Sequence, residues 1–151
     1  MEQSDFVISH TMCLVQSFNQ LTGRELVPGV SDERELSRQV FQAPFVVVSH
    51  GTEPDPVLNY GNAVALGLWE MSWAEFTGTP SRFTAEAPNR EERARLLADV
   101  TARGFIDDYA GVRISRSGRR FRIARATVWN VFSREGQPVG QAATFREWEW
   151  L

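Results

Sequence analysis

The first hydrophobic pattern in the chain is that of one helix face, formed by Val7, Leu14, Phe18 and Leu21. These positions recur at the period of an α-helix. Ser4 or Asp5 can cap the N-terminus of this helix, and Gly23 can end it. A second, shorter helix is predicted to begin at Asp32, which can form a capping box with Glu35. The start of the chain is therefore predicted to be two helices.

Strand patterns begin after Pro44. The continuous apolar run at 45–48 predicts a buried strand, and the loop 51–56, rich in Gly and Pro, turns the chain into a second short strand at 57–60. Asn62 then stands where a helix should begin, because its side-chain oxygen can accept hydrogen bonds from the free amides of a first helical turn.

The second half of the chain combines one long helix with strands. The helix is predicted to begin at Asn89, with Glu92 as its capping-box partner, and to end at Gly104. Three strands joined by two tight turns follow, over residues 106–115, 121–132 and 138–145. The order helices, two strands, helices, three strands predicts an α+β fold.

Composition narrows the class of protein. The chain has 151 residues, of which 42% are hydrophobic and 23% charged, and this is typical of one globular domain rather than a disordered chain. The net charge of −3 argues against a nucleic-acid partner, since phosphate binding depends on accumulated Lys and Arg. The arginines between residues 113 and 125 are interpreted as the solvated face of a hairpin.

Cysteine usage and the N-terminus indicate the compartment. Cys13 is the only cysteine, so the chain can form neither an intramolecular disulfide nor a thiolate metal cluster, and a reducing compartment fits best. Residues 1–5 are acidic where a signal peptide would be basic. No apolar run approaches the length of a membrane span. We predict a cytoplasmic protein with no membrane association.

The sequence offers little to catalysis or metal binding. His10 and His50 are its only histidines, too few and too far apart for a zinc site. A nucleophile elbow is missing, Ser49 and His50 would point to opposite faces of a strand, and neither phosphate-loop motif is present. We therefore predict no catalytic residues and no metal, and expect His50 to bond to turn carbonyls or to Asp55.

Blocks spread over nearly the whole chain resemble the MEKHLA domain family. They are residues 21–26 (LTGREL), 49–62 (SHGTEPDPVLNYGN), 68–71 (LWEM), 104–109 (GFIDDY), 111–115 (GVRIS) and 140–145 (GQAATF). This family is a PAS-related group found in bacterial proteins and at the C-terminus of some plant homeodomain transcription factors. The resemblance implies a sensing or interaction role without a known ligand or catalytic set.

The resemblance also implies an architecture. It is a five-stranded antiparallel PAS-like sheet with helices on one face, in the PAS strand order with the first strand central. We place the N-terminal helical extension at residues 1–43 and the PAS-like MEKHLA domain at 44–151, the two forming one folding unit.

Residues 78–83 (GTPSRF) are similar to a motif of the flavin-binding light sensors of the PAS group, in which a cysteine forms the flavin adduct. Ser81 stands at the matching position, so a covalent adduct is excluded. The same alignment places Arg113, Ile123 and Ala142 where those sensors carry flavin-binding Asn and Gln residues. We expect no cofactor.

The alignment turns Arg113 toward the concave side of the sheet, and strand alternation then groups Phe121, Ile123, Arg125, Thr127 and Trp129 on one face. One hypothesis is that Arg113, alone or with Arg125, meets an anionic ligand such as a small carboxylate beside Trp129 and Trp69. The alternative is that Asp107, Asp108 or Glu70 pairs with Arg113 inside a filled core. The predicted ligand-binding residues are Trp69, Phe83, Tyr109, Arg113, Arg125, Thr127, Trp129 and Gln141, with the facing of Gln141 dependent on the strand register.

Aromatic residues near the chain end suggest a partner surface. Trp148 and Trp150 alternate with two glutamates, and together with Phe18 on the first helix they are predicted to form a homodimer interface. The alternative is that the first helix folds over its own sheet and these tryptophans pack within the chain.

Two functions stay open at this point. The first is a non-catalytic sensory domain that binds a small molecule and signals to a separate effector protein. The second is a protein-interaction or homodimerisation module with a filled core. A cavity of roughly 300 Å³ or more, lined by Arg113 and Trp129, would favour sensing.

Overall fold

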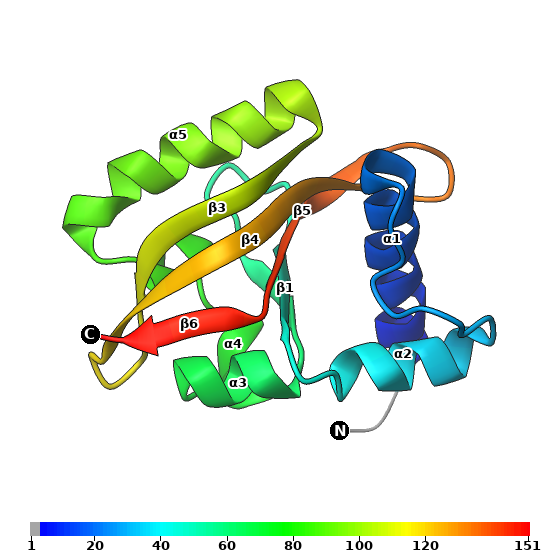
Figure 1. The fold of residues 1–151 in the computed structure, drawn as a ribbon, viewed down its shortest axis with the longest axis horizontal. Coiled ribbons are helices and arrows are strands. Elements are labelled where there is room, and N and C mark those ends of the chain that lie inside the picture. Colours follow the sequence, from blue (N-terminus) through cyan, green and yellow to red (C-terminus); the bar gives the residue numbers. More distant parts are fainter. Residues whose placement is uncertain (1–3) are drawn as a thin grey trace.

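The computed structural model describes residues 4–151 (Figure 1). Its helices are α1 (Asp5–Thr22), α2 (Glu33–Phe41), α3 (Ala63–Trp69), α4 (Trp73–Phe76) and α5 (Ala87–Arg103), with a 3-10 turn η1 (Ser81–Thr84). Its strands are β1 (Val46–His50), β2 (Leu58–Gly61), β3 (Phe105–Ile114), β4 (Arg120–Phe132), β5 (Pro138–Phe145) and β6 (Glu147–Trp150). Within these residues no helix is both long enough and apolar enough to cross a bilayer.

The strands form one antiparallel sheet in the order β2-β1-β5-β4-β3. β5 is the central strand, and β1, which we predicted to be central, is its neighbour. The short strand β6 pairs with the start of β4, from Phe121 to Ala124, whereas β5 pairs with the later part, from Thr127 onward. The predicted five-stranded sheet is therefore extended by a sixth strand at the chain end.

The predicted helix ends depend on local capping. Ser4 accepts a hydrogen bond from the amide of Val7 (3.2 Å), and Gly23 ends α1 in the left-handed conformation at φ 74°. Asp32 caps α2 in the same way, accepting from the amide of Glu35 (2.9 Å). α5 begins at Ala87 rather than at Asn89, because a proline occupies its first turn, where the missing N–H leaves no hydrogen bond unmade.

Asn62 is a buried junction between three elements. Its Oδ1 accepts from the amides of Ala65 (3.2 Å) and Val47 (3.1 Å), which caps α3 as the sequence predicted. Its Nδ2 donates to the carbonyls of Val40 (3.1 Å) and Phe45 (2.7 Å). Every hydrogen of the side-chain amide is thus bonded inside the protein, and the end of α2, the start of β1 and the start of α3 are tied together.

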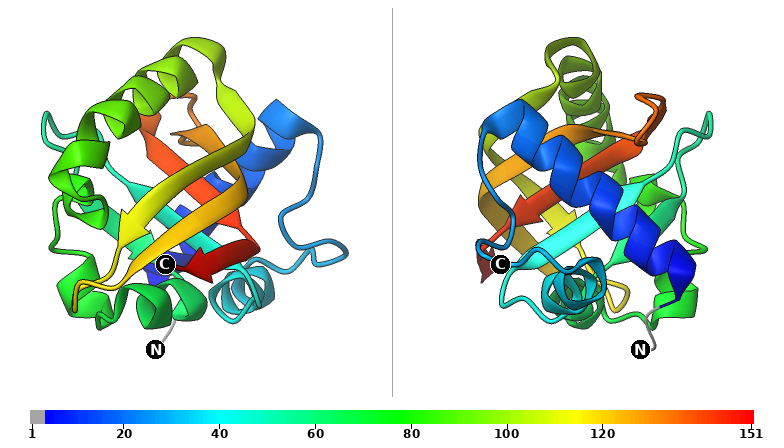
Figure 2. Two further views of the ribbon diagram at one scale, coloured as in Figure 1. Left: turned by 60° about the vertical axis from the view of Figure 1, so that its left-hand side comes forward. Right: turned by 90° about the vertical axis from the view of Figure 1, so that its right-hand side faces the viewer.

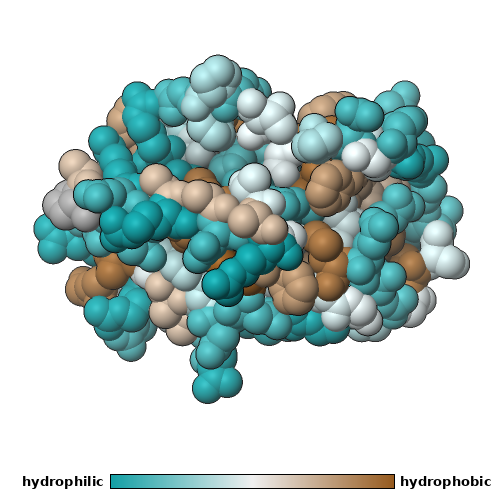
Figure 3. Space-filling model, turned by 90° about the horizontal axis from the view of Figure 1, so that it is seen from above, coloured by the Kyte–Doolittle hydropathy of each residue, from teal (hydrophilic) through white to brown (hydrophobic). Residues whose placement is uncertain are grey.

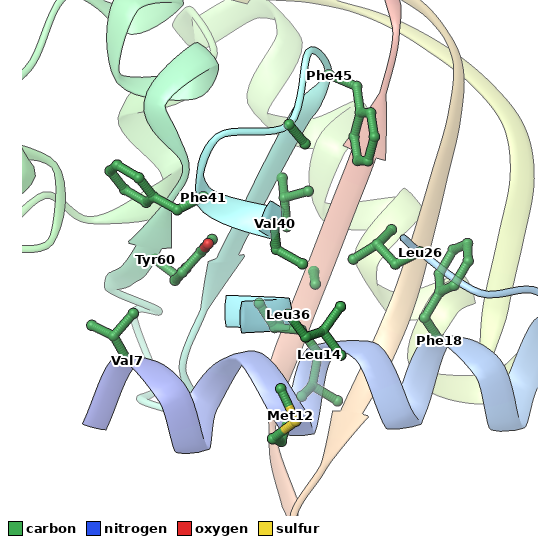
Figure 4. Packing of buried hydrophobic residues seen from close by; sticks show 14 of the residues in the cluster. Val7, Met12, Leu14, Phe18, Leu26, Leu36, Val40, Phe41, Phe45 and Tyr60 are labelled. Atoms are coloured by element: carbon green, nitrogen blue, oxygen red, sulfur yellow. The ribbon is translucent and has the colours of Figure 1, made fainter. Parts of the chain in front are cut away.

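One face of the sheet, here called the outer face, is covered by α1 and α2 (Figures 1 and 2). Leu14 and Phe18 of α1 pack there with Val40 of α2 (Figure 4), and Trp129 of β4 belongs to the same buried cluster. Phe18 and Trp129 meet edge to face, with ring centroids 4.9 Å apart. The N-terminal helices therefore share a hydrophobic core with the sheet.

The opposite face, here called the inner face, is covered by α3, α4 and α5. Trp69, Phe121 and Phe145 form the centre of one buried cluster, in which the rings of Trp69 and Phe121 lie 5.3 Å apart. A smaller cluster holds α5 against the sheet through Leu96, Val100 and Val128.

Two register shifts interrupt the pairing of β3 with β4. Between Ile123 and Ala126, β4 advances three residues while β3 advances two, and Arg125 adopts the left-handed conformation at φ 54°. A second shift lies on β3, at Asp108 with φ 57°. An extra residue in one strand is a β-bulge, and it reverses the facing of every side chain beyond it.

Candidate functional site

A cavity of about 70 Å³ lies between the inner face of the sheet and the helices α3, α4 and α5. Its apolar walls include Leu58, Trp69, Phe76, Leu96 and Phe145, and its polar lining residues include His50, Arg93, Tyr109, Arg113 and Gln141. A single water needs about 10–15 Å³ of such space, so the cavity has room for several waters or for a ligand of a few non-hydrogen atoms.

Arg113 of β3 is 6% exposed and lies at this cavity. Its Nη1 donates to the carbonyl of Val112 (2.9 Å) and its Nη2 to the hydroxyl of Tyr109 (3.1 Å). The Tyr109 hydroxyl in turn donates to Glu92 (3.0 Å). Within residues 4–151 the guanidinium of Arg113 makes no ion pair with a carboxylate.

The acidic partners that the sequence offered Arg113 are engaged elsewhere. Asp107 pairs with Arg24 (2.9 Å) and accepts from Thr127 (2.6 Å). Glu70 accepts from the hydroxyl of Ser117 (2.6 Å), and Asp108 is exposed at the bulge in β3. The predicted buried ion pair is therefore wrong, and Arg113 is left without a counter-ion among the described residues.

A second arginine, Arg93 of α5, lies at the same cavity. Its Nη2 donates to the hydroxyl of Ser81 (2.9 Å). Burial, with a further contribution from the positive charge of Arg113, lowers the pKa of Arg93 to about 10. Sequence reasoning missed this residue, although one signal was present: Arg93 is three residues before Leu96 and seven before Val100, on the inward stripe of α5.

The site therefore combines two positive groups of which neither has an ion-pair partner within residues 4–151. Each guanidinium has five N–H donors, and the described bonds use two at Arg113 and one at Arg93. Trp69, which is 3% exposed, adds an indole Nε1–H with no acceptor in the same part of the chain. The cavity is lined by hydrogen-bond donors in excess of acceptors.

His50 and Gln141 close the cavity at the ends of β1 and β5. His50 Nε2 lies 3.2 Å from Gln141 Oε1, while Gln141 Nε2 donates to the carbonyl of Leu97 and the hydroxyl of Thr101, both at 3.0 Å. A surface depression of about 360 Å³ is lined by the same His50 and Gln141. These two side chains therefore stand between the cavity and the surface. The expected bonds from His50 to Asp55 or to turn carbonyls are wrong.

His50 is uncharged at neutral pH. Burial, with a smaller contribution from the positive charge of Arg93, lowers its pKa to about 4. Arg93 and Arg113 are thus the positive groups of the cavity at neutral pH, and His50 contributes a neutral imidazole.

The structure divides the eight predicted ligand-binding residues into two groups. Trp69, Tyr109, Arg113 and Gln141 line the cavity, and Gln141 is now seen to face inward. The other four, Phe83, Arg125, Thr127 and Trp129, do not line it.

The β-bulge at Arg125 explains most of this error. Thr127 and Trp129 lie beyond the extra residue, so they face the opposite side of the sheet from Phe121 and Ile123. Arg125 itself is exposed and pairs with Glu147 (3.3 Å). The predicted grouping of these residues on one face with Ile123 is therefore wrong.

Phe83 fails for a different reason. It belongs to the short turn η1 and is 45% exposed, with the guanidinium groups of Arg82 and Arg90 stacked on its ring at 4.5 and 5.1 Å. It lies on the surface rather than in the cavity wall.

The predicted interface residues are used mainly inside the chain. Phe18 is 4% exposed under α1, so the apolar face of that helix covers its own sheet. Trp148 packs edge to face on Phe145, and Trp150 packs on Phe121 while staying 42% exposed. On the side seen in Figure 3 the apolar residues form several groups separated by hydrophilic ones.

The fold matches that of solved PAS domains. The PAS domain of a protein from Colwellia psychrerythraea superposes with a TM-score of 0.64 at 14% identity, over 76% of this chain and 94% of that one. The light-state dimer of the fungal blue-light photoreceptor Vivid gives 0.60 at 15% identity, over 90% and 93%. A light-oxygen-voltage domain studied with a flavin analogue gives 0.57 at 18% identity, over 78% and 84%.

At these identities the likeness is one of fold, and this chain has a PAS-like fold. The family model of the MEKHLA domain matches residues 8–150, and the chain belongs to the MEKHLA domain family. The comparison with curated proteins found no match. The resemblance drawn from the sequence is confirmed, together with the α+β PAS-like fold.

The cavity does not fit a flavin. Its volume of about 70 Å³ is well below the roughly 300–1,000 Å³ of typical pockets for ligands of drug size. Trp69 and Phe76 stand in its wall with their rings 6.0 Å apart, and Ser81, in place of the adduct-forming cysteine, accepts a hydrogen bond from Arg93.

Proposed function

We propose that this domain is a non-catalytic sensor that binds a small anionic ligand in the inner-face cavity and signals to a separate protein. The observation that carries the proposal is the presence of two arginines, Arg93 and Arg113, that share this cavity and have no carboxylate ion-pair partner within residues 4–151. The four groups that the sequence and the cavity have in common, Trp69, Tyr109, Arg113 and Gln141, form the binding site together with Arg93.

The energetics of buried charge support an anionic ligand. A guanidinium that leaves water without a counter-ion costs several kcal/mol, and that cost is recovered only through close charges and hydrogen bonds of good geometry. Arg113 is 6% exposed and receives only a carbonyl and a hydroxyl acceptor. An anion in the cavity supplies the missing charge, and the planar fork of arginine suits a carboxylate in particular.

The position of the two arginines supports signalling. Arg93 belongs to α5 and Arg113 to β3, so an anion held by both joins a helix to the sheet that it covers. Gln141 links the same helix to the central strand through Leu97 and Thr101. Ligand binding would therefore change how firmly α5 is held against the sheet. We expect an effector protein to bind to the surface of this helix.

The test is thermal unfolding with and without anions, for the wild type and for Arg113→Met. We expect acetate, phosphate or another simple anion to raise the Tm of the wild type, measured at constant ionic strength, and to leave that of Arg113→Met unchanged. Without an anion, Arg113→Met should be at least as stable as the wild type, because replacing an unpaired buried charge by an apolar side chain is often neutral or stabilising.

Arg122→Met is the matched control. Arg122 lies on the neighbouring strand with a half-exposed side chain paired to Glu149 (3.4 Å), so its loss should leave the anion effect intact. Native mass spectrometry of the wild type should show a retained small ligand. Equal Tm shifts in the wild type and Arg113→Met would overturn the proposal, and a complete lack of anion effects would favour an interaction module with a filled core.

A further inference from the structure

The lining of the cavity combines charged and apolar side chains. Arg93 and Arg113 supply the charged groups, while Trp69, Phe76 and Phe145 supply apolar wall. An inorganic anion such as phosphate is polar on all sides, and in this cavity part of its surface would lose hydrogen bonds against those rings. A carboxylate with an apolar tail presents one polar end to the arginines and hydrocarbon to the rest.

The volume limits the length of that tail. About 70 Å³ corresponds to about five to seven water-sized groups, taking about 10–15 Å³ for each. Acetate, propionate and butyrate have about four to six non-hydrogen atoms and match this size. A longer acid or an aromatic acid would need the walls to move.

The local charges limit the ligand to one carboxylate. Glu92 accepts from the Tyr109 hydroxyl, which itself accepts from Arg113, so one negative charge already stands a single hydrogen-bond step behind the arginine. One carboxylate in the cavity would bring the group to two positive and two negative charges. A second carboxylate would add an unpaired negative charge among apolar side chains, which is costly.

We infer that the ligand is a short-chain monocarboxylate of about two to four carbons, held by Arg93 and Arg113 with its tail against Trp69, Phe76 and Phe145. This inference rests on the proposed function and narrows its ligand class. Ala143 also lines the cavity, so a larger side chain at this position would reduce the space inside it.

The experiment is a chain-length series followed by Tm and by calorimetric titration of the full chain. Acetate, propionate, butyrate, hexanoate, succinate and phosphate are compared as sodium salts at equal ionic strength. We expect propionate or butyrate to bind tightest, with hexanoate, succinate and phosphate at least about tenfold weaker. Arg113→Met and, separately, Arg93→Met should each abolish the binding of propionate.

Ala143→Val provides a second test that does not depend on losing a charge. The added methyl groups should shift the preference from butyrate toward acetate, a change of rank order that general destabilisation would not produce. If succinate, phosphate or hexanoate binds tighter than every short monocarboxylate and Arg113→Met abolishes that binding, the inference is wrong and the proposed function stands. If no anion binds, both are wrong.

Discussion

Each face of the sheet buries a tryptophan, but the hydrogen bonding of the two indole groups differs. On the outer face, Trp129 is fully buried against Phe18, and its indole Nε1 donates to the carbonyl of Leu14 (3.3 Å). On the inner face, Trp69 is buried among rings as well, but its Nε1 has no acceptor in residues 4–151 and a cavity with two arginines lies beside it. A buried tryptophan whose N–H is bonded within the protein contributes to stability, whereas an open N–H donor beside a cavity is available to a ligand.

Among the substitutions that test this contrast between the two faces, one at Trp129 is expected to have the largest effect on stability. Trp129→Ala should lower the free energy of unfolding by about 3–5 kcal/mol, because it leaves a large cavity in the outer core. Denaturant unfolding measures this loss. The Tm shift produced by a binding anion should persist in the variant under conditions where it is folded. A variant that folds but no longer responds to anions would show that the two faces are coupled and would break the contrast.

A smaller effect is expected on the pH dependence of stability, because each face of the sheet buries one histidine. His10 on the outer face bonds to Ser49 (2.9 Å) and His50 on the inner face to Gln141, and burial lowers the pKa of each from 6.5 to about 4. The unfolded chain therefore binds more protons between pH 6.5 and pH 4, so stability should be fully present above pH 6.5 and fall as the pH decreases through this window. At pH 5 the loss should be about 2 kcal/mol for each histidine.

His10→Gln and His50→Gln, made separately, measure these contributions in urea unfolding at pH 7 and pH 5. Each variant should lose less stability than the wild type over this interval, by similar amounts. A wild-type slope that neither substitution reduces would show that both imidazoles are hydrated when protonated. A reduction in His10→Gln alone would show that water reaches His50 through the cavity, which would sharpen the difference between the faces.

The smallest effect concerns the bulge that separates the faces. Arg125 has a left-handed backbone at φ 54°, a conformation that costs a non-glycine residue about 1–2 kcal/mol, whereas Arg122 is an ordinary strand residue. Both are exposed and each pairs with a glutamate of β6. Arg125→Gly should therefore be more stable than Arg122→Gly by about 1 kcal/mol, measured by denaturant unfolding. Equal stabilities would mean that the backbone at Arg125 carries no strain.

Much of the fold followed from the sequence because its signals are local. Ser4, Gly23, Asp32 and Asn62 cap helices through bonds to atoms within a few residues, and the strand alternation of Trp148 and Trp150 holds as expected. The start of α5 was placed two residues too late, since Asn89 has the chemistry of a cap but lies inside the first turn.

The site was predicted only in part, because its composition depends on which face of the sheet each side chain occupies. The alignment to the light sensors placed Arg113 correctly at the cavity, and Tyr109 also lines it as predicted. The bulges occur at Arg125 and Asp108, residue types that give less warning of a left-handed backbone than glycine would. The predicted face of the sheet was therefore wrong for every side chain that we placed by counting across residue 125. Arg93 was missed for the opposite reason: it belongs to a regular helix, where an arginine is normally assigned to solvent.

The hydrogen bonds of Asn62 have a consequence for how this module could be moved between proteins. A fragment beginning at residue 44 would lack the Val40 carbonyl that Asn62 uses, and it would expose the outer-face side of Trp129 that α1 covers. The unit that can be transplanted intact therefore begins at α1, before the boundary that strand patterns alone suggest. In a fusion to a domain placed before it, the two would be connected through α1, a helix that also covers the hydrophobic core.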